Sequence, residues 1–258
     1  MKICTLCPRM CAVDRKSGER GICGQTTEIK VARAALHFWE EPCISGEMGS
    51  GAVFFSGCAL HCVFCQNENI ANGTAGKVIS TERLGEIFLE LQEKGANNIN
   101  LVTPGQFVPQ IIKAVELARN QNLKIPIVYN TSSYENVDTI RSLEGIVDIY
   151  LPDFKYFDTA LSAKYSHAPD YPAVAKAVIA EMVRQTGAAV FENGEDSLMK
   201  RGTIVRHLIL PGCTKDSKAV LKYLHETYEN DRNGKIQSPY IHTSKQNRIR
   251  EKISGIKP

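Results

Sequence analysis

The sequence predicts an α/β fold built as a partial (β/α) barrel, with a small cysteine-rich N-terminal extension. Short apolar runs alternate with helical patterns through most of the chain, which is typical of parallel βαβ units. Polar residues follow several of these runs, at the strand ends where barrel enzymes carry their active sites. At 258 residues we expect an open or partial barrel rather than a full eight-unit one.

The elements follow from local patterns. The extension offers one hairpin arm over 29–38 and too little apolar material to form a core alone. Apolar runs bounded by turn residues predict strands at 52–55, 98–103, 125–129, 146–151 and 203–210, with a weak last strand at 236–241. Apolar residues at helical spacing predict helices at 81–91, 107–119, 137–143, 171–185 and 217–228. We therefore divide the chain into 1–49, the barrel at 50–232 and a basic, poorly ordered tail at 233–258.

Charge and hydropathy exclude several classes of protein. The formal net charge is +3, and 235–258 alone carries +5, so the rest of the chain is close to neutral. This balance does not support nucleic-acid binding. No apolar run approaches the ~18 residues that a membrane span needs, and the first residues lack the apolar core of a signal peptide. We expect a cytoplasmic protein without a membrane partner.

The cysteines give the first indication of function. Eight of the nine lie at or before Cys65, and Cys213 stands alone. An odd number of cysteines without a signal peptide argues against a disulfide scaffold. In a reducing compartment, clustered thiols more often hold metal, so we expect a metal site.

The segment 57–67 carries the most specific motif. Cys58, Cys62 and Cys65 form a C-x3-C-x2-C pattern directly after the first barrel strand, with the aromatic Phe64 before the last cysteine. Structural zinc prefers four ligands, whereas three thiolates on one loop favour a [4Fe–4S] cluster with one iron left open. The alternatives are a zinc knuckle that borrows a distant fourth ligand, or buried thiols without metal.

This loop resembles that of the radical S-adenosylmethionine (radical SAM) superfamily, and 50–230 is most similar to the pyruvate formate-lyase activating enzymes. The resemblance implies that Cys58, Cys62 and Cys65 hold a [4Fe–4S] cluster whose open iron binds S-adenosylmethionine. It also implies that one electron cleaves S-adenosylmethionine to a 5′-deoxyadenosyl radical, with flavodoxin or ferredoxin as reductant. The cofactor supplies the difficult chemistry, and the protein positions and shields it.

The same resemblance suggests contacts to S-adenosylmethionine at the strand ends. Thr103-Pro104-Gly105 stands where the family has a Gly-Gly-Glu turn, so Gly105 is a contact although the family's carboxylate is missing there. The other implied contacts are Asn130, Thr131, Asp153, Lys155 and Arg206. Cations, acceptors and donors of these kinds suit a zwitterionic amino acid and a ribose. The alternative is that they are ordinary solvated strand ends or caps.

The function implied is activation of a partner glycyl radical enzyme by hydrogen abstraction from a backbone glycine. One alternative is radical SAM chemistry on a small molecule or on another protein. Another is a non-catalytic metal-binding or electron-transfer protein. Activating enzymes of this type continue into a further apolar strand, and this tail is polar and basic. We therefore expect the chain to be incomplete as an enzyme.

A second group of cysteines lies in the extension. Cys4, Cys7, Cys11 and Cys23 have the spacing C-x2-C-x3-C-x11-C. Four thiolates can close a tetrahedral zinc site or ligate a second iron–sulfur cluster, and the spacing alone does not separate the two. Free thiols are the alternative. Phe38 and Trp39, at the end of the hairpin arm, are expected to pack the extension onto the barrel.

Overall fold

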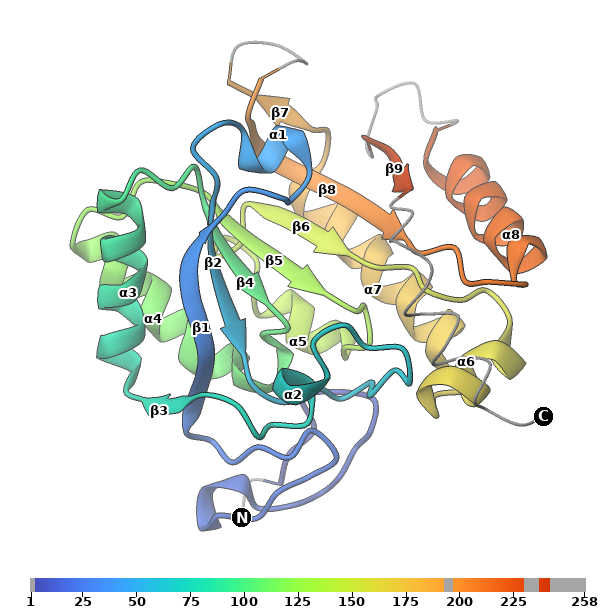
Figure 1. Cartoon of the computed structure of the whole chain (residues 1–258), viewed down its shortest axis with the longest axis horizontal. Helices are drawn as coiled ribbons and strands as arrows, with labels where there is room; N and C mark the ends of the chain where they lie inside the picture. Colours follow the sequence, from blue (N-terminus) through green and yellow to red (C-terminus); the bar gives the residue numbers. More distant parts are fainter. Residues whose placement is uncertain (1–2, 193–196, 230–236, 242–258) are drawn as a thin grey trace.

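A curved, mostly parallel β-sheet forms the centre of the protein (Figure 1). The structure is a computed structural model that describes residues 3–192, 197–229 and 237–241. Within these residues the sheet has nine strands in the order β3-β1-β2-β4-β5-β6-β8-β7, with β9 beside β8. The five strands β2, β4, β5, β6 and β8 are parallel neighbours in chain order. The predicted α/β fold with an open, partial barrel is therefore confirmed.

The strands are β1 Ile29–His37, β2 Ser50–Phe55, β3 Lys77–Ile79, β4 Ile99–Val102, β5 Ile127–Thr131, β6 Ile149–Pro152, β7 Val190–Phe191, β8 Met199–His207 and β9 Gln237–Ile241. The α-helices are α1 Pro42–Ser45, α2 Glu68–Ala71, α3 Thr81–Glu93, α4 Val108–Asn120, α5 Val137–Arg141, α6 Thr159–Ser166, α7 Tyr171–Thr186 and α8 Thr214–Leu224. Short 3₁₀ turns lie at Arg15–Ser17 and Gly105–Phe107, and a π-helical turn lies at His225–Glu229.

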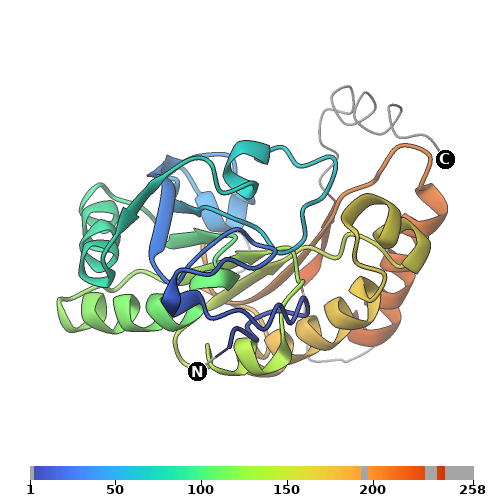
Figure 2. The same ribbon diagram turned by 90° about the horizontal axis from the view of Figure 1, so that it is seen from below.

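The helices that follow the parallel strands lie along the outer side of the curved sheet (Figure 2). Their apolar faces and the sheet enclose the largest hydrophobic cluster, which includes Phe88, Ile111 and Tyr129. Helix α3 shows why these segments are helical. The Ser80 side chain caps the helix by accepting a hydrogen bond from the Arg83 amide at 3.1 Å. The buried residues of α3, among them Leu84, Phe88 and Leu91, recur at helical spacing. The covered strands are buried on both faces, so they read as continuous apolar runs.

Several bounds differ from those predicted. Strand β8 begins at Met199 and ends at His207, and β5 extends to Thr131, so that Asn130 and Thr131 lie within the strand. Helix α8 begins at Thr214. Helix α6 was not predicted, because its buried faces include serines and it has no regular apolar spacing.

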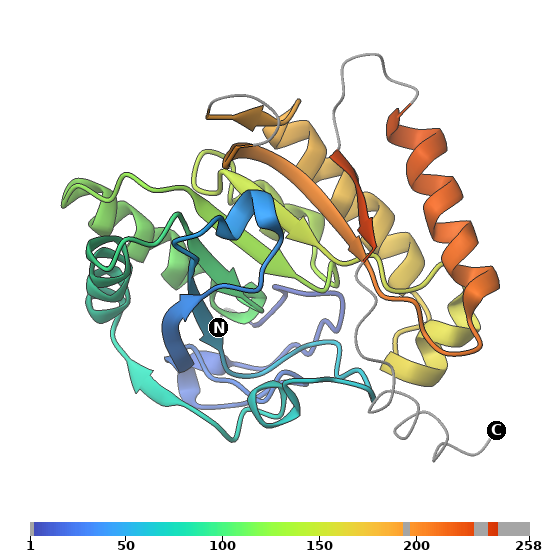
Figure 3. The ribbon, with the colours of Figure 1, turned by 45° about the horizontal axis from the view of Figure 1, so that its top comes forward.

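The far end of the chain is described in part. Strand β9 runs parallel to β8, as Figure 3 shows, so the predicted last strand is confirmed in its backbone. The expected disorder of the tail at 233–258 concerns, apart from β9, residues 233–236 and 242–258, which lie outside the described residues. The division into 1–49, 50–232 and 233–258 stays a prediction. Among the described helices, none has the length and apolar character to cross a bilayer.

Candidate active site

The loop between β2 and α2 carries Cys58, Cys62 and Cys65 at the carboxyl edge of the sheet. Leu60 and Phe64, which lie between these cysteines, are buried in a second hydrophobic cluster and anchor the loop. The loop begins at Gly57, which has a φ of +88°, and a Cβ there would stand 2.4 Å from the Cys23 carbonyl oxygen. Apolar anchors and a required glycine therefore fix the path of the loop.

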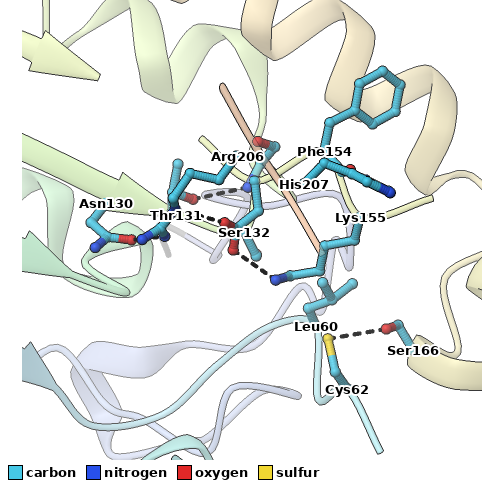
Figure 4. Close-up of polar contacts among 12 residues, drawn as sticks. Leu60, Cys62, Asn130, Thr131, Ser132, Phe154, Lys155, Ser166, Arg206 and His207 are labelled. Carbon is cyan, nitrogen blue, oxygen red and sulfur yellow. Dashed lines mark hydrogen bonds and ion pairs between the residues drawn. The ribbon is translucent and has the colours of Figure 1, made fainter. Parts of the chain in front are cut away.

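The Cys62 thiol contacts residues that the sequence analysis missed. Ser166, the last residue of α6, donates a hydrogen bond to Cys62 Sγ at 3.1 Å (Figure 4). The Tyr156 hydroxyl lies 2.7 Å from Ser166 Oγ and completes a chain of three polar groups. Burial raises the pKa of the Cys62 thiol, whereas Lys155 and the Ser166 hydrogen bond oppose this shift. No sequence motif links these residues, because they meet only through the packing of α6 against the loop.

Opposite the loop, charged side chains at the ends of three parallel strands form one network (Figure 4). Asp153 accepts from Lys155 Nζ at 2.6 Å and from Arg206 Nε at 3.0 Å. Arg206 also donates to Asn130 Oδ1 at 2.6 Å. Burial alone would raise the pKa of Asp153, but Arg206 and Lys155 lower it overall. The network therefore holds an ionised carboxylate between two cations. It lies beside the 57–67 loop that carries Cys58, Cys62 and Cys65 (the cluster loop).

A cavity of about 750 Å³ lies between the network and the loop. This volume is in the range of small-molecule and cofactor sites. The cavity is lined by the predicted residues Cys58, Cys62, Cys65, Asn130, Thr131, Asp153, Lys155 and Arg206. Also at its wall is His207, whose Nε2 is buried and has no hydrogen-bond partner among the described residues. Three thiols and a converging set of charged and polar groups fit a metal cluster with a zwitterionic ligand.

Gly105 lies elsewhere. It lines a smaller cavity of about 30 Å³ behind Cys58, together with Thr131 and Glu135. A Cβ on Gly105 would stand 2.4 Å from Glu135 Oε2. The Glu135 carboxylate accepts from Thr131 Oγ1 at 2.7 Å, and burial raises its pKa to about 7. A carboxylate therefore does lie beside the 103–105 turn, and the loop after β5 supplies it. In the sequence, the only sign of this role is that Glu135 follows Thr131 by four residues.

The aromatic pair after β1 is placed differently from expectation. Phe38 and Trp39 line the large cavity, and their exposed fractions are 52% and 87%. The prediction that they pack the extension onto the barrel is wrong for Trp39. The adjacent Glu40 side chain is 11% exposed, and its carboxylate lies 3.4 Å from Arg206 Nη1. The segment thus lines the cavity with two carboxylates, Glu40 and Glu41 (the acidic wall), and with two exposed aromatic rings.

The extension cysteines lie on the other side of Cys58. Cys4, Cys7 and Cys23 line the smaller cavity together with Cys58, and Cys11 lies next to Gly21. Burial raises the pKa of Cys7 to about 12. Among the described residues, no three Cys, His, Asp or Glu side chains already form a group arranged to hold a single metal ion, and this applies to the cysteines of both sets.

An open parallel barrel with three loop thiols at a polar cavity defines a class of iron–sulfur enzymes. The family described as the radical SAM superfamily matches residues 52–224. The chain therefore belongs to the radical SAM superfamily, whose members use a [4Fe–4S] cluster and S-adenosylmethionine. The predicted contacts at individual residues stay predictions.

Two further comparisons give more distant likenesses. An uncharacterised protein of Methanocaldococcus jannaschii is 27% identical over 225 residues, or 83% of this chain. The chain spans about 60% of the length of that relative. The crystal structure of a methylornithine synthase aligns with a TM-score of 0.43 at 18% identity, over 74% of this chain and 52% of the other.

Proposed function

We propose that this protein activates a partner glycyl radical enzyme by abstracting hydrogen from a backbone glycine. Cys58, Cys62 and Cys65 hold the [4Fe–4S] cluster, and the cavity beside them binds S-adenosylmethionine. Reductive cleavage of S-adenosylmethionine supplies the 5′-deoxyadenosyl radical for this reaction. The proposal includes flavodoxin or ferredoxin as the electron donor, and it places the protein in the cytoplasm, where thiols stay reduced.

One observation carries the cofactor assignment: the three loop cysteines and five predicted strand-end residues line the same cavity. Lys155 is suited to pair with the carboxylate of the methionine moiety, and Asp153 orients Lys155 at 2.6 Å. Asn130 and Thr131 supply a carbonyl oxygen and a hydroxyl on the adjacent strand. The chain thus provides complementary groups for both charges of a zwitterion.

Two exposed aromatic residues at the cavity's edge support a polypeptide substrate. Phe38 and Trp39 stand exposed on the edge of the cavity that contains the cluster loop. Exposed aromatic side chains at a cavity mouth are suited to binding a peptide segment, because aromatic residues dominate protein–protein contacts. The likeness of the cluster loop to those of activating enzymes points to the same class of partner.

The first test is anaerobic reconstitution with iron and sulfide, followed by reduction in the presence of S-adenosylmethionine. We expect 5′-deoxyadenosine from the wild-type protein and none from Cys62→Ala. Cys43→Ala is the matched control, because Cys43 belongs to neither group of cysteines. A wild-type protein that holds a full cluster without cleaving S-adenosylmethionine would favour the electron-transfer alternative.

The second test concerns the substrate. Glycyl radical enzymes are incubated with the reduced, loaded protein, and EPR is used to detect a glycyl radical. We expect that signal to require both Cys62 and S-adenosylmethionine. Release of 5′-deoxyadenosine without a protein radical, but with turnover of an added small molecule, would replace this proposal with the small-molecule alternative.

A further inference from the structure

We infer that Cys4, Cys7, Cys11 and Cys23 form a second, structural metal site that holds zinc or an iron–sulfur cluster through four thiolates. This site goes beyond the proposed function, because it lies outside the cavity that contains the cluster loop. Sulfur-only ligation suits both zinc and iron–sulfur centres. Four protein ligands leave no open position, so the site does not bind substrate.

The four cysteines lie in the same part of the extension although they come from separate turns. Three of the four line one small cavity. Cys11 Sγ accepts a hydrogen bond from the Ile22 amide at 3.3 Å. This contact places Cys11 beside the turn that carries Cys23.

The backbone around Cys11 adopts a demanding conformation. Met10 and Ala12, on either side of it, have φ values of 43° and 55°. Residues other than glycine rarely adopt this left-handed conformation, and such strain persists where the surroundings enforce it. A Cβ on Gly21 would stand 2.8 Å from Cys11 Sγ, so the facing turn requires glycine for a close approach. Both features hold Cys11 against the turn that precedes Cys23.

Arg15 supplies an independent observation. Its side chain is buried, with 5% exposure, and it donates to the carbonyl oxygens of Gln25 at 3.1 Å and Gln106 at 2.8 Å. Its Nη1 also lies 3.9 Å from Cys4 Sγ. Among the described residues, no carboxylate lies within ion-pair distance of Arg15. Buried cations need a compensating negative charge, and a tetrathiolate metal centre carries one.

The segment also lacks another source of stability. No described residue before Ile29 belongs to the three hydrophobic clusters of the protein. Small segments without a core use metal to supply the missing stability. The site would fix Arg9, whose guanidinium donates to the carbonyl oxygens of Ala59 at 2.9 Å and Ser166 at 2.9 Å. The N-terminal metal would thereby hold a strap across the cluster loop and the end of α6.

The test is the metal content of a protein with Cys58, Cys62 and Cys65 all changed to Ala, purified without oxygen. We expect about one zinc, or iron with inorganic sulfide, to remain bound. Adding Cys4→Ala and Cys23→Ala should remove this metal, whereas adding Cys43→Ala should leave it. Because S-adenosylmethionine is not used, the result is independent of the proposed function.

A second measurement protects the test against variants that fail to fold. In the anaerobic wild-type protein, iodoacetamide labelling read by mass spectrometry should modify Cys43 and Cys213 well before the four N-terminal cysteines. A strong chelator should increase the labelling rate of the four N-terminal cysteines at least tenfold. A folded, metal-free triple variant whose four N-terminal thiols label as fast as Cys213 would overturn the inference.

Discussion

At the scale of single residues, Lys155 is the side chain whose role the network defines best. It lines the large cavity and its Nζ lies 2.6 Å from Asp153, which also pairs with Arg206. A charge-assisted hydrogen bond contributes about 1.5–3 kcal/mol. Lys155→Ala should therefore weaken S-adenosylmethionine binding by about 10- to 150-fold, measured by titration, while the cluster still assembles.

Lys164→Ala is the matched control for this change, because Lys164 stacks on Tyr165 and does not line the cavity. It should leave the affinity unchanged. If Lys155→Ala binds S-adenosylmethionine as tightly as the control does, Lys155 serves only its ion pair with Asp153.

Ser166 should act on the cluster's potential rather than on its assembly. Its hydroxyl donates to Cys62 Sγ at 3.1 Å, and hydrogen bonds to cluster sulfur stabilise the more negative, reduced state. Ser166→Ala should lower the midpoint potential by about 20–60 mV, which corresponds to about 0.5–1.5 kcal/mol for one electron. An EPR-monitored redox titration measures this shift.

Two variants separate this role from a loss of packing. Ser162 is equally buried on α6 but donates to the Thr159 carbonyl oxygen, so Ser162→Ala should leave the potential unchanged. Tyr156→Phe removes the group behind Ser166 and should give a smaller shift in the same direction. Equal potentials in Ser166→Ala and Ser162→Ala would contradict the assignment.

At the scale of elements, the sequence predicted those segments whose burial follows a simple period. Strands β4, β5 and β6 are covered on both faces and read as apolar runs, and α3 and α4 bury one stripe. Helix α6 was missed because Ser162 and Ser166 face inward. The motif likewise singled out three cysteines that line the large cavity, whereas Glu135 and Ser166 reach the site only through tertiary packing.

The cluster loop itself depends on its first glycine. Gly57 has a φ of +88°, and an added Cβ would meet the Cys23 carbonyl oxygen at 2.4 Å. Gly57→Ala should destabilise the protein by about 1–3 kcal/mol and reduce cluster occupancy, measured by thermal unfolding and iron content. Gly145→Ala has a similar φ of +77° but open space around the new Cβ, so it isolates the conformational cost. Equal losses in the two variants would mean that the contact with Cys23 contributes nothing.

At the scale of the whole molecule, Cys58 lies between two different environments. The large cavity, with its network of charged side chains, lies on one side, and the small cavity of the extension lies on the other. The extension reaches both, since Glu40 faces Arg206 while Arg9 holds the cluster loop. A segment with little core of its own thereby encloses the site from two directions.

This enclosure buries carboxylates and should make global stability depend on pH. Burial raises the pKa of Glu40 to about 7, with Arg206 opposing the shift and Glu41 adding to it. A folded-state pKa above the unfolded value of roughly 4.3 means that the native protein binds more protons between these values. Stability should therefore be greatest at low pH within this window and fall as pH rises through about 7.

Glu40→Gln removes the titrating group while keeping its shape. Its free energy of unfolding, from denaturant titrations at pH 5, 6, 7 and 8, should decline less with pH than that of the wild-type protein. The difference is at most about 1.4 kcal/mol per pH unit. Glu135, whose pKa burial raises to about 7, remains in the variant and leaves part of the decline in place. Glu47→Gln, at an exposed position, should follow the wild-type profile. Parallel profiles for Glu40→Gln and the wild-type protein would show that Arg206 neutralises Glu40 completely, and that the acidic wall of the cavity costs the fold nothing.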